Sequence, residues 1–515
     1  MVTPDGVVAA TTSNTPLDRY LAEQGELTAV ERFTQAAEGG AVREKTGTWR
    51  DRIPLTRPVV GQQYAFHVDL DTCTGCKACV TACHNLNGLD DGESFRTVGL
   101  LTGGTAAGGE PRSTPAQPFQ QTVTTACHHC LDPACLTGCP TNAYDKDVST
   151  GIVAHIEGRC LGCGYCTWTC PYEVPRFNAA RGVVRKCDMC RDRLVAGQEP
   201  ACVSACPNGA ITIAVVDTAT LRHETDRPGQ TLVPTAPPSD ITRPTTTYHS
   251  DWGLPEGLRA VGGTIDDGGR SHGPLVAMLV LTQAAAGAFA VDLVAGHRAA
   301  TPVIALALAL VGLVVSLLHL GHPERAWRAM AGLRHSWLSR EVATLGAFSG
   351  LALVSVVTGS RVVEVAAAVA GLTGVVCSAM LYVVTRRPSW RAALTGPRFA
   401  VSTLVSGAAV AMAAGAGRPV GVVLAVALAA KLTGEMAYVW RPMTESAPAS
   451  GAPLGLSTRA WIRLALGVAA VVVAGAGPTG LVAAGVLVAV LAGELLERSQ
   501  FFTDASWTGM PGPKR

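Results

Sequence analysis

Cysteine dominates the chemistry that this sequence of 515 residues could perform. Sixteen of its 17 cysteines lie between Cys73 and Cys206, and Cys377 stands alone in an apolar run, where we expect it to serve only in packing. Closely spaced thiols bind soft metals or form disulfides. The sixteen form four groups: Cys73, Cys76, Cys79 and Cys83; Cys127, Cys130, Cys135 and Cys139; Cys160, Cys163, Cys166 and Cys170; and Cys187, Cys190, Cys202 and Cys206.

The spacing of these groups favours iron–sulfur clusters. The first and third read C-x2-C-x2-C-x3-C, and proline follows Cys139, Cys170 and Cys206. A tight C-x2-C-x2-C loop places three thiolates around one cubane, and the fourth cysteine ligates the neighbouring cluster, as in two-cluster ferredoxins. We therefore predict four [4Fe–4S] clusters in close pairs. Spacing alone leaves open which groups pair.

Zinc and disulfides are the alternatives. Zinc ribbons use two C-x2-C pairs at longer separation, which differs from the triplets seen here. Disulfides suit secreted proteins, but MVTPDGVVAATTSNTPLDRY shows neither a basic and apolar signal nor a twin-arginine motif. We expect His128 and His129 to shape a cluster's surroundings or lie at the surface, because the cysteine count is already complete.

Composition divides the chain into a polar, acidic front and an apolar, basic back. Residues 1–271 hold 23 Lys and Arg against 30 Asp and Glu, whereas 272–515 hold 18 against 9. We predict an α+β double two-cluster ferredoxin-like domain followed by an all-α eight-helix transmembrane bundle. The expected parts are a polar N-terminal extension (1–62), the ferredoxin-like domain (63–215), a linker with little core of its own (216–271) and a membrane anchor (272–510).

Eight apolar segments, most of them near the roughly 20 residues that span a bilayer, predict the anchor. A soluble helical core would show alternating polar and apolar faces, which these segments mostly lack. The segments are 274–296, 302–320, 342–359, 362–384, 400–416, 419–440, 464–478 and 479–497.

Loop charges predict the orientation. With eight spans, the loops on the side of the N-terminus carry fourteen Lys and Arg, and the other side carries only Arg298, Arg361 and Arg418. Positive residues stay in the cytoplasm. We therefore expect the cysteine domain and both termini to face the cytoplasm, at the cell inner (plasma) membrane. An odd number of spans would spoil this count.

Histidines in the apolar region argue against haem. Bis-histidine haem b needs facing histidine pairs within spans, but only His319 lies at the end of a span and no histidine follows His335. We expect no haem, and direct electron exchange between a quinol and a cluster. No nucleic-acid partner is expected.

Stretches such as TTACHHCLDPACLTGCP, CLGCGYCTWTCPYEVPRFN and RKCDMC resemble the four-cluster electron-transfer subunit of the dimethyl sulfoxide reductase family, over about 63–215. The resemblance implies that the first group pairs with the fourth and the second with the third. The implied ligand sets are Cys73, Cys76, Cys79 and Cys206; Cys187, Cys190, Cys202 and Cys83; Cys127, Cys130, Cys135 and Cys170; and Cys160, Cys163, Cys166 and Cys139.

Two apolar stretches resemble that family's membrane anchor, which binds menaquinol and carries no haem. They are SLLHLGHPERAWRAMAGLRHSWLSRE (316–341) and LAGELLERSQFF (491–502). The resemblance implies quinol oxidation at His319 and Glu341, and Gln283 aligns with an anchor glutamine that could belong to the site. Quinol releases protons with its electrons, and histidine titrates near neutral pH.

Each of these residues has a plainer interpretation. His319 could be a structural residue at the interface, and Glu341 could cap a helix together with Ser339. Lys431 and Glu435 stand four apart in an apolar span and could form an ion pair or part of a proton path.

The sequence thus predicts a fusion of two subunits that are separate chains in the family. Such a non-catalytic redox subunit would pass electrons from menaquinol in the quinone pool of the lipid bilayer, through four clusters, to a separate molybdopterin-containing catalytic subunit. The same architecture could run in reverse, from a formate-type dehydrogenase subunit to quinone.

Overall fold

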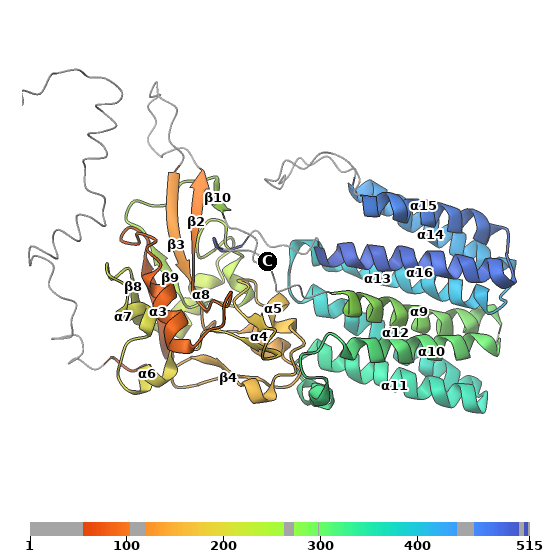
Figure 1. Cartoon of the computed structure of the whole chain (residues 1–515), viewed down its shortest axis with the longest axis horizontal. Helices are drawn as coiled ribbons and strands as arrows, with labels where there is room; N and C mark the ends of the chain where they lie inside the picture. Colours follow the sequence, from red (N-terminus) through yellow and green to blue (C-terminus); the bar gives the residue numbers. More distant parts are fainter. Residues whose placement is uncertain are drawn as a thin grey trace, which may run out of the picture.

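The computed structural model describes residues 55–103, 119–261, 272–296, 298–439, 458–503 and 509–512. The expected N-terminal extension therefore lies mostly outside the described residues. The described residues form a soluble part of short strands and helices and a bundle of long helices (Figure 1). The bundle helices run side by side, and the soluble part covers one end of them. A cysteine-bearing α+β domain followed by a helical bundle is the order predicted from the sequence.

Two three-stranded sheets organise the soluble part. The first contains, in order, β8 (Ile211–Asp217), β1 (Gln62–Asp69) and β9 (Thr247–His249). The second contains β10 (Leu258–Val261), β2 (Thr97–Gly103) and β3 (Phe119–Thr125). The central strand of the first sheet is covered on both faces, because Tyr64, Ala65 and Phe66 are all buried. Such a strand reads as a short apolar run rather than as an alternating pattern.

The cysteines sit beside short elements: the helices α3 (Ala78–Asn87), α4 (Ala134–Gly138), α5 (Tyr165–Thr169), α6 (Arg191–Val195) and α7 (Ala201–Ser204), and the hairpins β4 (Tyr144–Lys146) with β5 (Val153–His155) and β6 (Arg176–Asn178) with β7 (Val183–Arg185). Helices α4 and α5 end at Cys139 and Cys170, whose backbones are extended. A following proline forces this conformation on the preceding residue. The C-P step therefore turns the fourth cysteine of the second and third groups out of its helix.

The segment expected to be a linker folds onto the soluble part over its described residues, up to 261. It supplies α8 (Thr218–Thr225), and its strands β9 and β10 pair with β1 and β2. Val233 and Ala236 are buried in the same core as Leu101. The expectation of little core failed because a Thr- and Pro-rich composition is typical of linkers but equally suits short edge strands that protect a sheet.

The bundle is built around α9, and its helices are α9 (Gly273–Ala295), α10 (Ala300–Leu317), α11 (Trp337–Thr358), α12 (Arg361–Val383), α13 (Ala392–Ala413), α14 (Arg418–Val439), α15 (Thr458–Gly475) and α16 (Gly480–Thr503). Helix α9 is the most buried candidate span and contacts α10, α12, α13 and α16. Its small residues allow this close packing, because a Cβ atom on Gly287 would overlap the carbonyl oxygen of Thr403.

Five of these helices, within the described residues, are long and apolar enough to cross a membrane. They are α9, α10, α11, α12 and α16, and residues 460–475 of α15 form a shorter apolar helix. Exposed Val314, Leu353, Val369 and Val472 lie on the helices of the bundle, as expected where lipid replaces water. The helical region therefore suits a membrane, and the count of eight spans stays a prediction.

An aromatic cluster joins the bundle to the soluble part. Trp168 of α5 stacks on Phe502 of α16, with ring centroids 5.3 Å apart, and meets Trp390 edge-on at 5.9 Å. Trp390, in the turn η5 (Pro388–Trp390), is fully buried and donates a hydrogen bond to the carbonyl oxygen of Phe501 at 3.1 Å. Aromatic rings of the soluble part and of the bundle are buried against each other, and this burial fixes the soluble part to the helix ends.

Residues 509–512, beyond α16, also return to the soluble part. Met510 is buried there, and the hydroxyl of Thr235 donates to the carbonyl oxygen of Gly509 at 3.3 Å. A Cβ atom on Gly99 of β2 would overlap the backbone of Pro511. The protein thus contacts its cysteine domain again after the last helix.

We predict that Trp390→Ala destabilises the junction by about 3–5 kcal/mol, the usual loss for a buried tryptophan. Thermal unfolding of the detergent-solubilised protein would show a lower midpoint. The control is Trp461→Ala, since Trp461 is 57% exposed and its removal should leave the midpoint nearly unchanged. Equal midpoints for the two variants would contradict the role assigned to the aromatic cluster.

Candidate metal centres and the cavity beside them

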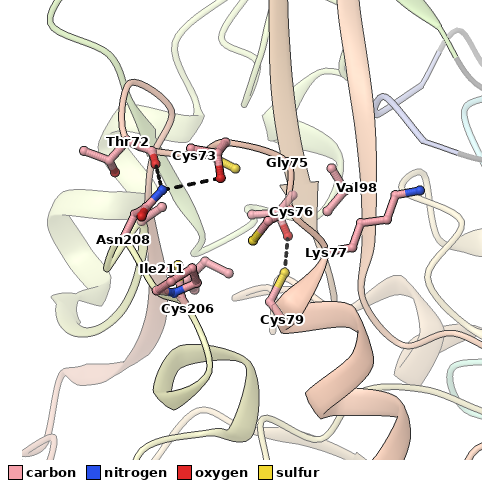
Figure 2. A pocket seen from close by; sticks show the side chains of 14 residues that line it. Thr72, Cys73, Gly75, Cys76, Lys77, Cys79, Val98, Cys206, Asn208 and Ile211 are labelled. Carbon is pink, nitrogen blue, oxygen red and sulfur yellow. Dashed lines mark hydrogen bonds between the residues drawn. The ribbon is translucent and has the colours of Figure 1, made fainter. Parts of the chain in front are cut away.

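One of the implied ligand sets lines a cavity at the start of α3. Its cysteines are Cys73, Cys76, Cys79 and Cys206, whose side chains gather around the hollow in Figure 2. The amide of Asn208 donates to the carbonyl oxygen of Thr72 at 3.1 Å and to the hydroxyl of Thr74 at 3.4 Å. Gly75 has a φ of +71°, and a Cβ there would lie 2.8 Å from the methyl of Thr122. Glycine therefore lets the cysteine loop lie directly on β3.

A second implied set lines a separate cavity, together with Lys186 and Thr242. Its cysteines are Cys127, Cys130, Cys135 and Cys170. The first three belong to one group in the sequence and the last to the next group, as the resemblance implies. The fold therefore brings together cysteines that spacing alone could not pair.

The remaining two sets also converge. Burial, and then the neighbouring Cys202, raise the pKa of Cys83 to about 12. Burial likewise raises the pKa of Cys166 well above its ordinary value, with further increases from Cys163 and Cys139. Buried thiols that lie close together lose their protons readily only when they bind a metal cation. These two groupings match the other implied sets.

Two buried cations strengthen the fit to an anionic cluster. Lys186 and Arg96 are 5% and 2% exposed, and neither forms an ion pair with a carboxylate in the described residues. Burial lowers the pKa of Lys186, but the thiols of Cys127, Cys135 and Cys187, and then Asp188, outweigh it and raise the pKa overall. A buried cation needs a nearby negative charge. A cluster held by four thiolates would supply that charge.

A single metal ion fits less well. Within the described ranges, no three or more His, Cys, Asp or Glu side chains converge on one metal-ion position. Zinc needs four ligands within about 2.0–2.3 Å of one centre. Four cysteines around a hollow instead suit a cluster of several irons.

A larger cavity, with a volume of about 330 Å³, lies where the bundle meets the soluble part. It is lined by His319, Glu341 and Cys163 together with apolar side chains, among them Leu275, Met278, Leu313, Leu317, Leu338 and Leu345. Glu341 is buried in α11 and accepts a hydrogen bond from the hydroxyl of Ser378 in α12. An apolar cavity with a few convergent polar groups is the usual form of a small-molecule site.

Backbone contacts hold the wall of this cavity against the third cysteine group. The amide of His322 donates to the carbonyl oxygen of Leu161 at 3.0 Å, and Arg325 donates to that of Cys160 at 2.8 Å. A Cβ atom on Gly321 would overlap the carbonyl oxygen of Gly182. The loop that carries His319 is therefore in direct contact with the loop that carries Cys163.

The other predicted residues lie elsewhere. Gln283 is buried, does not line this cavity, and accepts a hydrogen bond from Arg498 at 3.1 Å. Lys431 pairs with Glu494 at 2.6 Å rather than with Glu435. Glu435 pairs instead with Arg463.

Glu341 is not a helix cap, and His128 and His129 are not surface residues. Helix α11 starts at Trp337, so Glu341 lies beyond its first turn and is no cap. His128 and His129 are buried rather than at the surface, and burial lowers the pKa of His128 to about 3. Burial also lowers the pKa of His129, whose ring nitrogen accepts a hydrogen bond from the amide of Val153 at 3.0 Å.

Sequence reasoning missed two residues of this region. Ser378 reaches Glu341 from another helix, and Tyr165 donates from the third cysteine group to the carbonyl oxygen of Leu381 at 2.6 Å. Both contacts join segments far apart in the sequence, so no local pattern indicated them.

We predict about 16 iron atoms per anaerobically purified protein molecule, from four cubanes, and brown colour. Cys76→Ser removes one predicted ligand and should lower the iron content and weaken absorption near 400 nm. Cys377→Ser, which alters a cysteine outside the four groups, should leave both unchanged. Iron and zinc analysis provides the measurement, and zinc without iron would refute the assignment.

Comparison with known proteins agrees with this geometry. Residues 119–216 match the family described as a 4Fe-4S dicluster domain, and residues 267–433 match the DMSO reductase anchor subunit (DmsC). The nitrate-inducible formate dehydrogenase iron-sulfur subunit of Escherichia coli is 39% identical over 154 residues, which cover 28% of this chain and 51% of that protein.

Two further relatives are subunits of a reductase. The B subunit of anaerobic dimethyl sulfoxide reductase from Haemophilus influenzae is 38% identical over 183 residues, 36% of this chain and 87% of that protein. The corresponding subunit from Escherichia coli is 38% identical over 162 residues, 31% of this chain and 78% of that protein. The protein therefore belongs to the dimethyl sulfoxide reductase family, as a fusion of its 4Fe-4S electron-transfer subunit with its membrane anchor subunit.

Proposed function

We propose that this protein takes electrons from menaquinol and passes them through four [4Fe–4S] clusters to a molybdopterin-containing catalytic subunit. One observation carries the proposal: the cavity that holds His319 and Glu341 also exposes Cys163. A quinol headgroup bound there would lie beside a cluster ligand. Its apolar tail would meet leucine side chains and, beyond them, lipid.

The cysteine sets are arranged as a relay. The set of Cys163 adjoins the set of Cys127 through the exchanged Cys139 and Cys170. Cys127 lies close enough to Cys187 to raise the pKa of its thiol, which links the set of Cys127 to the set of Cys187. When bound, the clusters would carry single electrons along this line.

Two side chains in the cavity could accept the protons that quinol releases. Oxidation of quinol to quinone releases two electrons and two protons, so a base must stand at the hydroxyl groups. The carboxylate of Glu341 and the imidazole of His319 are the polar groups there that can accept a proton. Ser378 would hold Glu341 in place through its hydrogen bond.

Direct transfer without haem is supported by where the histidines lie. His272, His319, His322 and His335 all lie outside the helices, at the end of the bundle that meets the soluble part. None of these four is placed to face another across the middle of the bundle. We therefore keep haem out of the proposed relay.

The catalytic subunit is proposed from the relatives and from the exposed end of the relay. Relatives named as the B subunit of dimethyl sulfoxide reductase are parts of such complexes. Cys76 is exposed in the first cavity, where electrons could leave the protein. The match to formate dehydrogenase subunits supports a second candidate function, in which electrons run from that type of subunit to quinone.

We also propose that the bundle spans the cell inner membrane eight times, with the soluble part in the cytoplasm. Positive charge gathers at the end of the bundle next to the soluble part, and Arg298, Arg361 and Arg418 mark the other end. Arg325, Arg328, Arg386 and Arg387 contact the soluble part and so serve docking as well. Arg334, Arg340 and Arg391 still favour the cytoplasm at that end.

The quinol site predicts that His319→Ala and Glu341→Gln slow quinol-dependent cluster reduction by roughly 10²-fold, the usual loss of a proton acceptor. Reduction by dithionite should stay as in the wild type, because the relay is intact. Stopped-flow absorbance with a menaquinol analogue would measure both rates.

Matched controls are His335→Ala and Glu364→Gln. His335 follows on the same connection but does not line the cavity, and Glu364 is a buried glutamate at the start of α12. Both should keep the wild-type quinol rate. Unchanged quinol kinetics in His319→Ala and Glu341→Gln would remove the site.

The orientation predicts that a fluorescent protein fused after Arg515 fluoresces in cells, whereas alkaline phosphatase in that position is inactive. Phosphatase inserted between α9 and α10 should be active, because that connection would face outside. The opposite pattern would place the soluble part outside, and activity at neither site would argue against eight spans.

A further inference from the structure

Lys186 is a buried cation held between two of the predicted clusters. It follows β7 directly and precedes Cys187. Its ammonium donates to the carbonyl oxygens of Val153 and of Cys187, the latter at 2.8 Å. The same nitrogen lies 3.6 Å from the sulfur of Cys127. Two carbonyl acceptors thus fix the charge in one position.

The position is unusual because it joins two ligand sets. Cys127 belongs to the set that lines the second cavity, and Lys186 lines that cavity too. Cys187 belongs to the next set, whose other members include Cys83 and Cys202. An electron that passes from the inner pair of clusters to the outer pair must therefore pass the ammonium of Lys186.

Lys146 shows what an ordinary anchored lysine looks like in the same region. Its ammonium donates to the carbonyl oxygens of Cys130 and Leu131, at 2.9 and 2.8 Å. It is only half-buried and donates no hydrogen bond to a sulfur in the described structure. Water therefore screens its charge far more than that of Lys186.

We propose that Lys186 is a positioning residue for electron transfer that raises the reduction potential of the cluster held by Cys127, Cys130, Cys135 and Cys170. This inference rests on the proposed function, since it needs clusters in the cysteine sets. Reduction adds one negative charge to the cluster and moves no proton or bond. A fixed ammonium at 3.6 Å from one ligand sulfur stabilises that added charge, more strongly where water is excluded.

As a consequence, the reduced state of this cluster, midway along the relay, is stabilised. An electron that leaves the cavity side of the protein is drawn toward the junction of the two pairs. It then stands next to Cys187, the first ligand of the outer pair. Lys186 thereby directs electrons away from the quinol cavity.

Redox titration of membranes that contain the full-length protein, followed by electron paramagnetic resonance, tests this role. Lys186→Met should lower the potential of one cluster, so that its reduced-to-oxidised ratio at a fixed solution potential falls at least tenfold, which is about 59 mV for one electron. Lys186→Arg keeps the charge and should restore the ratio to near wild type. Lys146→Met removes a half-buried lysine from the same region and should change the ratio much less.

The outcomes separate this inference from the proposed function. Wild-type membranes without cluster signals would refute the proposed function itself. Full cluster signals with unchanged potentials in Lys186→Met would overturn only the role of Lys186. If Lys186→Met lost iron, Lys186→Gln would decide: a lowered potential supports the role, and loss of iron there as well would make the lysine a structural residue and overturn it.

Discussion

The structure depends on one close approach, that of the loop after α10 to the loop of the third cysteine group. Backbone meets backbone there, because Gly162 of the cysteine loop has no Cβ atom, and a Cβ atom at that position would overlap the backbone of Gly321. The hydrogen bond from His322 to Leu161 and the contact of Arg325 with Cys160 fix the register. Since no side chain intervenes, one cavity can reach both Glu341 and Cys163. A larger residue at Gly321 would force the two loops apart and so separate the cavity from Cys163.

Fusion of the two parts in one polypeptide strengthens that approach by adding contacts that do not involve the cavity. Trp168 carries the third cysteine group into the aromatic cluster with Phe502 and Trp390. Residues 509–512, beyond α16, add a further contact with the soluble part through Thr235 and the buried Met510. Contacts on several sides restrict rocking, which matters because a small tilt at the helix ends would move the cysteine loop away from His319.

How much of this the sequence could predict depends on the range of the interaction. Cysteine spacing and the C-P steps act over a few residues, so the metal chemistry and the ends of α4 and α5 follow from them. Which groups pair is a long-range property, so the ligand sets are implied only by the resemblance and not by spacing. The apolar segments predicted the helices of the bundle to within several residues of their ends. The segment expected to be a linker was predicted to have little core of its own, and this was wrong because its strands pair with β1 and β2, which is also a long-range interaction.

The same limit explains the individual site residues. His319 and Glu341 stand in one stretch that resembles a known anchor, so the resemblance singled out both, and both line one cavity. Ser378 and Tyr165 come from other segments, and only the fold brings Ser378 to Glu341 and Tyr165 to Leu381. The predicted pair of Lys431 and Glu435 obeyed helical spacing, but the structure gives each a partner on a different helix.

Buried charge is used in two opposite ways in this protein. In the bundle the cations meet carboxylates, and these contacts tie α13, α14 and α16 together. Lys431 pairs with Glu494, and Arg398 and Arg498 share Glu497. In the soluble part, Arg96 and Lys186 are similarly buried but face mainly thiols instead of carboxylates. A paired carboxylate there would neutralise these cations permanently and weaken their pull on an added electron. Thiolates that share their charge with iron leave the cations free to respond to the redox state. Within the described residues, the ammonium of Lys186 contacts two backbone carbonyl oxygens and the sulfur of Cys127 rather than a carboxylate.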